Sequence, residues 1–106
     1  MQGILSVPFI WNGKDVRGQP EVAASARCWE MNGPNGEELE LESFLLDDPL
    51  SGTANFDVDL AVGTHDFDFA LVDDDGTTGP SVRFSFEWTD AGPSAATVGG
   101  VTFTPK

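Results

Sequence analysis

The sequence contains few basic residues, one histidine, one cysteine and no tyrosine. Five Lys and Arg residues oppose 18 Asp and Glu residues among 106, which gives a formal net charge of −13. Such a surface repels nucleic-acid phosphates and anionic membranes, so we expect no nucleic acid and no membrane among its partners. The single cysteine, Cys28, excludes an intrachain disulfide.

Long apolar runs are also missing. The first residues after Met1, QGILSVPFIW, lack both a basic segment and an extended hydrophobic stretch, so we see no secretory signal and no membrane-spanning segment. We expect synthesis in the cytoplasm without a signal peptide. The length of the chain, the initial Met and the end at Pro105-Lys106 favour a complete small protein with one domain over residues 1–106.

The usual catalytic motifs are absent. The chain has no CxxC, no HExxH and no glycine-rich phosphate loop. We expect His65 to be a solvent-exposed turn residue and Cys28 to be a small buried apolar residue in a strand. Carboxylate pairs are so abundant that they do not indicate acid–base catalysis. The sequence therefore predicts a protein that is not an enzyme.

What the chain does have is strict alternation between Phe56 and Trp88. Apolar and polar residues alternate in three runs, Phe56–Val62, His65–Leu71 and Val82–Trp88. Successive side chains of a β-strand point to opposite faces, so each run predicts a strand with one apolar face and one mostly acidic face.

Four further segments complete the predicted strands: Ile4–Trp11, Val22–Met31, Glu37–Leu46 and Val101–Thr104. Pro8 indicates that the first is an edge strand or one that switches sheets. The second and third compete with helical interpretations, because alanine, glutamate and leucine favour helices, but period-two alternation and the Asn32–Gly36 turn signal favour strands. A loss of phase at 43–46 predicts a bulge. About seven short strands predict an all-β, two-sheet antiparallel β-sandwich.

The run LAVGTHDFDFALVDDDGTTGPS, from Leu60 to Ser81, resembles the end of a fibronectin type III domain. It has a leucine, a Gly-Thr turn, an aromatic alternating strand and a loop that ends in Gly-Pro-Ser. The resemblance implies an immunoglobulin-like sandwich with Trp29 as the core tryptophan. The chain departs from the family, because Phe67 is the nearest aromatic to the missing corner tyrosine, the loop after Val72 has another spacing, and residues 91–106 extend past the expected last strand.

Two acidic features suggest a cation site. Asp73, Asp74 and Asp75 precede Gly76 in one loop, and hard cations such as calcium prefer several carboxylate oxygens, although the full EF-hand spacing is absent. A hairpin turning at Gly63-Thr64 would also bring Asp59 close to Asp66 and Asp68, where like charges destabilise a sheet. The three loop aspartates are therefore our candidate calcium site.

Three functions remain open. The first is a non-enzymatic structural or interaction module with protein partners, in size and composition similar to the accessory proteins that decorate phage capsids or tails, and capable of forming a homo-oligomer. The second is a carbohydrate- or calcium-binding surface module, with Trp11 as the more exposed ring and Trp88 in the core. The third is an acidic mimic of nucleic acid. In an assembly, we expect the termini and the Asp90–Gly100 loop to take part.

Overall fold

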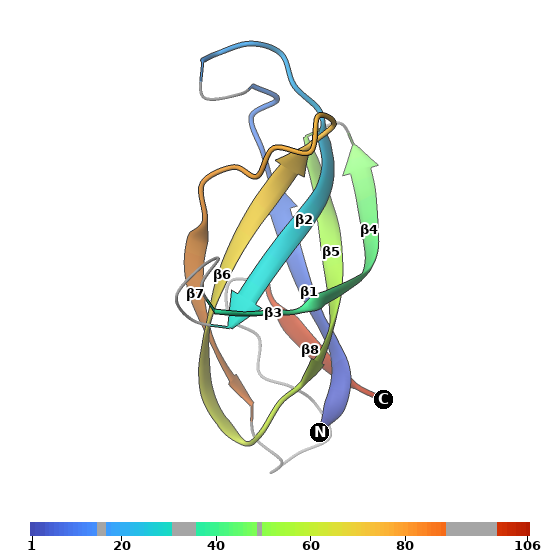
Figure 1. Ribbon diagram of the computed structural model, residues 1–106. Helices are drawn as coiled ribbons and strands as arrows, with labels where there is room; N and C mark the ends of the chain where they lie inside the picture. The colour runs from blue at the N-terminus through green and yellow to red at the C-terminus, as the bar shows by residue number, and fades with distance from the viewer. Residues whose placement is uncertain (15–16, 31–35, 49, 89–99) are drawn as a thin grey trace.

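Strands from both halves of the chain form two four-stranded antiparallel sheets (Figure 1). The computed structural model describes residues 1–14, 17–30, 36–48, 50–88 and 100–106. The predicted all-β, two-sheet sandwich is confirmed, with eight strands in the described ranges where about seven were predicted for the chain. Nowhere in the described ranges is there a helix long and apolar enough to cross a membrane.

The first sheet has the strand order β4-β5-β1-β8. Alternating burial along β1 and β5 places one face of each against the core, as the sequence alternation requires. The strands span Gln2–Ile10 (β1), Glu40–Asp48 (β4), Ser51–Asp59 (β5) and Thr102–Pro105 (β8).

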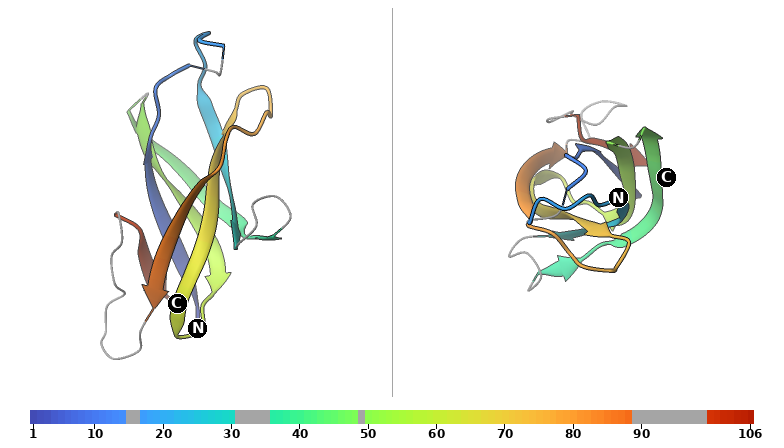
Figure 2. Two further views of the ribbon diagram at one scale, coloured as in Figure 1. Left: turned by 90° about the vertical axis from the view of Figure 1, so that its left-hand side faces the viewer. Right: turned by 90° about the horizontal axis from the view of Figure 1, so that it is seen from above.

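The second sheet has the strand order β3-β2-β6-β7. Its strands span Ala23–Glu30 (β2), Glu37–Glu38 (β3), Gly63–Asp73 (β6) and Val82–Trp88 (β7). Two views at right angles show the two sheets facing each other along the length of the molecule (Figure 2). The turn signal at residues 32–35 and nearly all of the predicted Asp90–Gly100 loop lie outside the described residues.

The core lies between the sheets and is dominated by phenylalanine. Phe56 from the first sheet meets Phe69 from the second with ring centroids 6.2 Å apart, and Trp88 meets Phe103 at 4.9 Å. Trp88 is buried, as predicted. Burying a large side chain of this kind stabilises the fold by about 1.5–3 kcal/mol, so these aromatic residues are the main source of stability.

Two predictions about the first half of the chain were wrong. β1 is an inner strand, because β5 and β8 pair with its two sides; its register with β8 covers only Gly3–Ser6, so Pro8 lies beyond that pairing. The predicted strand Glu37–Leu46 is divided at Leu39 into β3 and β4, which belong to different sheets. The predicted bulge falls close to its place, since the β4 register shifts between Leu41 and Ser43 and again after Leu46.

The predicted hairpin at Gly63-Thr64 is also wrong. β5 pairs with β1 and β4, whereas β6 pairs with β2 and β7, so the chain crosses from one sheet to the other after Asp59. Leu60 is buried at this crossover, and its N–H donates to the Met1 carbonyl at 2.9 Å. Alternation defines the faces of a strand but does not identify its neighbours.

Trp29 is buried on the outer face of the second sheet, not in the central core. Its neighbour Cys28 belongs to the core, and adjacent strand residues point to opposite faces. The Arg27 guanidinium lies 4.8 Å from the centre of the Trp29 ring and binds the Glu38 carboxylate at 2.6 Å. The cation–π contact covers the ring where solvent would otherwise reach it. Trp29 is therefore on the strand where the resemblance expects the core tryptophan, but its side chain is on the face that points away from the central core.

Candidate functional site

Three connections meet at one end of the sandwich, which we call the loop end (Figure 1). They are residues 11–14 and 17–22 between β1 and β2, the β4–β5 turn at Leu50, and residues 74–81 between β6 and β7. The Trp11 N–H donates to the Leu50 carbonyl and the Glu21 N–H to the Gly13 carbonyl, both at 2.9 Å. The first bond holds the start of the first connection against the turn, and the second joins two parts of that connection to each other.

The three loop aspartates predicted to bind calcium lie at this end. One carboxylate oxygen from each of Asp73, Asp74 and Asp75 lies within 4.8 Å of the others. Asp73 Oδ1 accepts hydrogen bonds from the backbone N–H of Asp75 at 2.9 Å and of Thr77 at 2.8 Å. One oxygen of Asp73 therefore holds the turn together. Calcium binding by the three residues stays a prediction.

Glu21 joins this acidic group, although it is far away in the sequence. A hydrogen bond with the Glu21 carboxyl lowers the pKa of Asp73, and the N–H groups of Thr77, Asp75 and Gly76 lower it further. The sequence alone does not show that Glu21 lies close to Asp73, because the two residues come together only through the antiparallel pairing of Ala23 with Asp73.

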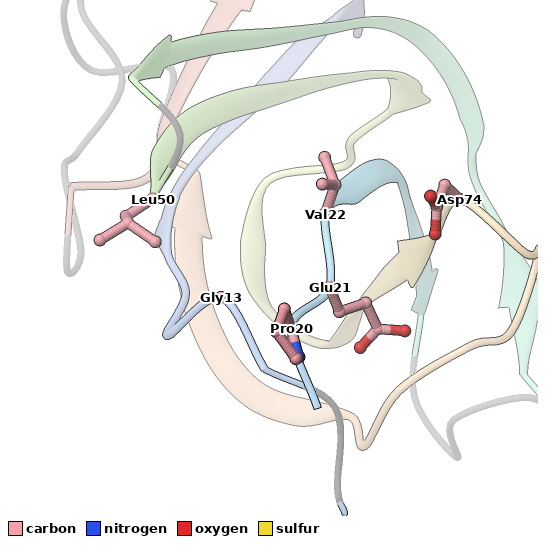
Figure 3. Close-up of a pocket in the computed structure, with 6 residues that line it drawn as sticks. All are labelled: Gly13, Pro20, Glu21, Val22, Leu50 and Asp74. Carbon is pink, nitrogen blue, oxygen red and sulfur yellow. The ribbon is translucent and has the colours of Figure 1, made fainter. Parts of the chain in front are cut away.

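A shallow hollow of about 380 Å³ opens between the three connections (Figure 3). Leu50 and Gly13 stand on one side of it, and the carboxylates of Glu21 and Asp74 on the other. Pro20 and Val22 complete its lining. The hollow thus combines an apolar wall with two acidic groups.

Exposed apolar side chains gather around the same end. Five of the eight large hydrophobic side chains that are exposed in the described ranges lie there, with 46 to 86% of their surface accessible: Ile10, Val22, Leu45, Leu46 and Leu50. The β-sheet register explains the grouping, because Ile10 pairs with Ser51 and Leu46 with Gly52 at the adjoining ends of three strands. Exposed apolar side chains that gather at one end in this way are typical of interaction sites in soluble proteins.

The acidic strand residues do not form the predicted cluster. Asp59 lies in the first sheet, 2.7 Å from the Met1 amino group, and Asp57 in the same sheet binds Lys106 at 2.6 Å. Asp68 lies in the second sheet, nearly buried, and binds Arg83 through both oxygens at 2.9 and 3.1 Å. Each carboxylate therefore has its own partner, and the expected repulsion across a hairpin does not arise.

His65 and Cys28 occupy structural positions. His65 lies in β6, mostly buried, instead of in an exposed turn; its Nδ1 is 2.9 Å from Glu30 Oε1 and its Nε2 is 2.8 Å from the Ala61 carbonyl. Cys28 is buried as predicted, and burial, together with the charges of Asp68 and Glu30, raises the pKa of its thiol to about 12. The Cys28 thiol therefore stays protonated at neutral pH and lacks the thiolate that a nucleophile needs.

No family model, no curated protein and no solved structure matches the chain. Function is therefore inferred from the geometry of the loop end.

Proposed function

We propose that the protein is a non-enzymatic interaction module that docks onto a protein partner through its loop end. One observation carries this proposal: the exposed apolar side chains of a strongly acidic chain are concentrated at one end of the sandwich. Apolar surface that serves no contact is a liability in water, and patches of this kind mark protein–protein sites. An accessory component of a larger assembly, such as a phage capsid or tail, fits this role.

The strand order supports an immunoglobulin-like class for the sandwich. Constant-type immunoglobulin domains have strands A, B, E and D in one sheet and C, F and G in the other. The order β8-β1-β5-β4 facing β3-β2-β6-β7 corresponds to it when β1 takes the place of strand B and β2 that of strand C. In this interpretation the last strand of the chain, β8, occupies the place of strand A.

The test compares surface variants of matched exposure at opposite ends. Leu46→Ser combined with Leu50→Ser removes two of the exposed side chains at the loop end, and Val62→Ser removes one of similar exposure at the β5–β6 crossover. A partner isolated from the natural assembly is purified, and the complex is reconstituted and measured by calorimetry. We expect binding to weaken at least tenfold in the double variant and to be unchanged in the control.

Two outcomes would overturn the proposal. One is a reconstituted complex that binds the double variant as tightly as the wild-type chain. The other is a complex weakened by the control at Val62, which would place the interface at the opposite end. Light scattering of the unbound protein separates self-association through the same surface from binding to a different partner.

A further inference from the structure

The strand β4 has a free edge. It is the terminal strand of the first sheet, at the right of Figure 1, and in the described ranges its backbone pairs with β5 alone. Just before its start, the Leu39 N–H donates to the Cys28 carbonyl of β2 at 2.8 Å, so the free part begins further along. An edge strand presents a row of N–H and C=O groups with which another extended chain can pair.

The part of this edge that can accept a strand is short. The register between β4 and β5 shifts between Leu41 and Ser43 and again between Leu46 and Asp48. Such bulges interrupt regular pairing and are one of the ways in which natural proteins protect their edge strands. Between the two shifts, Ser43–Leu46 pair residue by residue with β5, and none of these residues is charged. This segment, which we call the open edge, is the template for an added strand.

The side chains of the open edge are incompletely covered. Phe44 packs against the core, with its ring centroid 5.2 Å from that of Phe9, yet it is still partly exposed. Leu45 and Leu46, which belong to the exposed apolar group at the loop end, leave 56 and 46% of their surfaces accessible. Adjacent strand residues point to opposite faces, so an added strand would cover Phe44 and Leu46 on one face and Leu45 on the other.

The other three sheet edges offer less to a partner. β3 has two residues and β8 has four. β7 has seven, but Phe86 and Trp88 on its inward face are already buried, and the large apolar side chain that it exposes is Val82 at its first residue. An added strand therefore buries the most apolar surface at the edge of β4.

A second copy of the chain fits this edge poorly. Antiparallel pairing of Ser43–Leu46 with the same residues of another copy brings Glu42 of one copy beside Asp47 of the other at both ends. Like charges that face each other across two strands destabilise a sheet. Lys106 interacts with Glu42, but it is already hydrogen-bonded to Asp57 at 2.6 Å, so the carboxylates outnumber it. The flanks of the open edge therefore favour a segment of another protein that has no acidic residues.

We propose that the partner adds an extended segment of its own chain to β4 by pairing with the backbone of Ser43–Leu46. This inference rests on the proposed docking function and specifies how the partner binds. The segment has four uncharged residues, part of them apolar, and lysine or arginine at its ends beside Glu42 and Asp47. Backbone hydrogen bonds supply the affinity, and the side chains that cover the open edge supply the specificity.

A hexapeptide of this composition tests the open edge directly. Acetyl-Lys-Val-Thr-Val-Thr-Lys-amide is titrated into the ¹⁵N-labelled full chain at 150 mM salt and followed by NMR, and the same peptide with Glu at both ends is the charge control. We expect saturable shifts at Ser43–Leu46 with the lysine peptide and none with the glutamate peptide. Alternate amides of the open edge should also exchange more slowly with solvent, because every second N–H faces the added strand. The absence of saturable shifts up to about 5 mM lysine peptide would overturn the inference.

N-methylated forms of the lysine peptide separate strand addition from side-chain contact. A strand has two hydrogen-bonding edges, and N-methylation of alternate residues blocks one of them while the other can still pair with β4. N-methylation of all four central residues blocks both edges and leaves the side chains in place. We expect the first form to bind and the second to lose binding. Binding of the second form as tightly as that of the unmodified peptide would refute strand addition.

Two substitutions of equal charge locate the binding edge. Leu45→Lys on β4 and Val82→Lys on β7 each add one positive charge at an exposed strand residue. Leu45→Lys should weaken binding of the lysine peptide roughly two- to fivefold, the range of one cross-strand pair, and Val82→Lys should leave it unchanged. An equal loss in both variants would show a response to net charge alone and would contradict binding at β4.

The outcomes also separate this inference from the docking proposal. If the reconstituted partner depends on Leu46 and Leu50 but leaves amide exchange along Ser43–Leu46 unchanged, strand addition is wrong and docking at the loop end stands. If the partner is insensitive to the double substitution of the two leucines, the docking proposal itself fails.

Discussion

The hydrogen bonds of His65 predict a stability that declines as the pH rises. Nδ1 faces the Glu30 carboxylate and Nε2 faces the Ala61 carbonyl. A carbonyl never donates a hydrogen bond and an ionised carboxylate only accepts, so both ring nitrogens must carry protons. Burial of the ring lowers its pKa, but the bonds to Ala61 and Glu30 and the charge of Glu30 outweigh that effect and raise the pKa of His65 above 6.5.

The sign of the pH dependence follows from that direction. Because the folded-state pKa lies above the unfolded value, the imidazolium stabilises the fold fully below about pH 6.5. The contribution is lost as the pH rises through the folded-state pKa. Hydrogen bonds to charged groups contribute about 1.5–3 kcal/mol. The Glu30 side chain is 32% exposed, so we expect the lower end of that range, about 1.5 kcal/mol.

Urea denaturation of the wild-type and His65→Gln chains at pH 5.5 and pH 9 measures this contribution. With a slope of about 1.5 kcal/mol per molar urea, the midpoint at pH 5.5 should fall by roughly 1 M in the variant, and the difference should shrink at pH 9. Glu30→Gln is the matched control, since it removes the carboxylate and should abolish most of the pH dependence. A variant-to-wild-type difference that is constant or grows toward pH 9 would refute the reasoning.

Three further predictions concern other parts of the chain. Arg83→Met should destabilise the fold at pH 7 because it removes the cation that both oxygens of the nearly buried Asp68 carboxylate contact, and adding Asp68→Asn should recover most of that loss in thermal melts. A circular permutant that joins Lys106 to Met1 and opens the chain before β8 should keep the wild-type circular dichroism spectrum, since the Lys106 N–H already donates to the Gln2 carbonyl. Loss of that spectrum would contradict the assignment of β8 to the place of strand A. If Asp73–Asp75 bind calcium with a dissociation constant near 10⁻⁴ M, 10 mM calcium should stabilise the fold by about 2.7 kcal/mol, and an unchanged melting midpoint would exclude the site.

The faces of the strands could be predicted from sequence, but their neighbours could not. Phe56, Phe67 and Phe86 point inward as the alternation requires. Their strands nevertheless belong to two sheets. The alternation could not reveal this, because period two is the same whether the next run continues the sheet or crosses to the opposite one. Even the division at Leu39 leaves the pattern intact, since its side chain still packs against the core while the strand changes sheets.

The candidate site was only partly visible in the sequence. Asp73–Asp75 are adjacent in the chain, so their proximity needs no fold. Glu21 and Leu50 reach the same hollow only through the pairing of β2 with β6 and the contact of Trp11 with the β4–β5 turn. The resemblance also misplaced Trp29, because a buried tryptophan on the correct strand can face either side when a neighbouring arginine covers it.

The distribution of exposed apolar side chains favours a binding role over solubility alone. A composition that served only solubility would disperse these side chains over the surface, since dispersal keeps hydrophobic patches small. In this fold five of the eight large apolar side chains that are exposed in the described ranges lie at the loop end. That grouping at one end of a strongly acidic chain is the arrangement that the apolar surface of a protein partner would recognise.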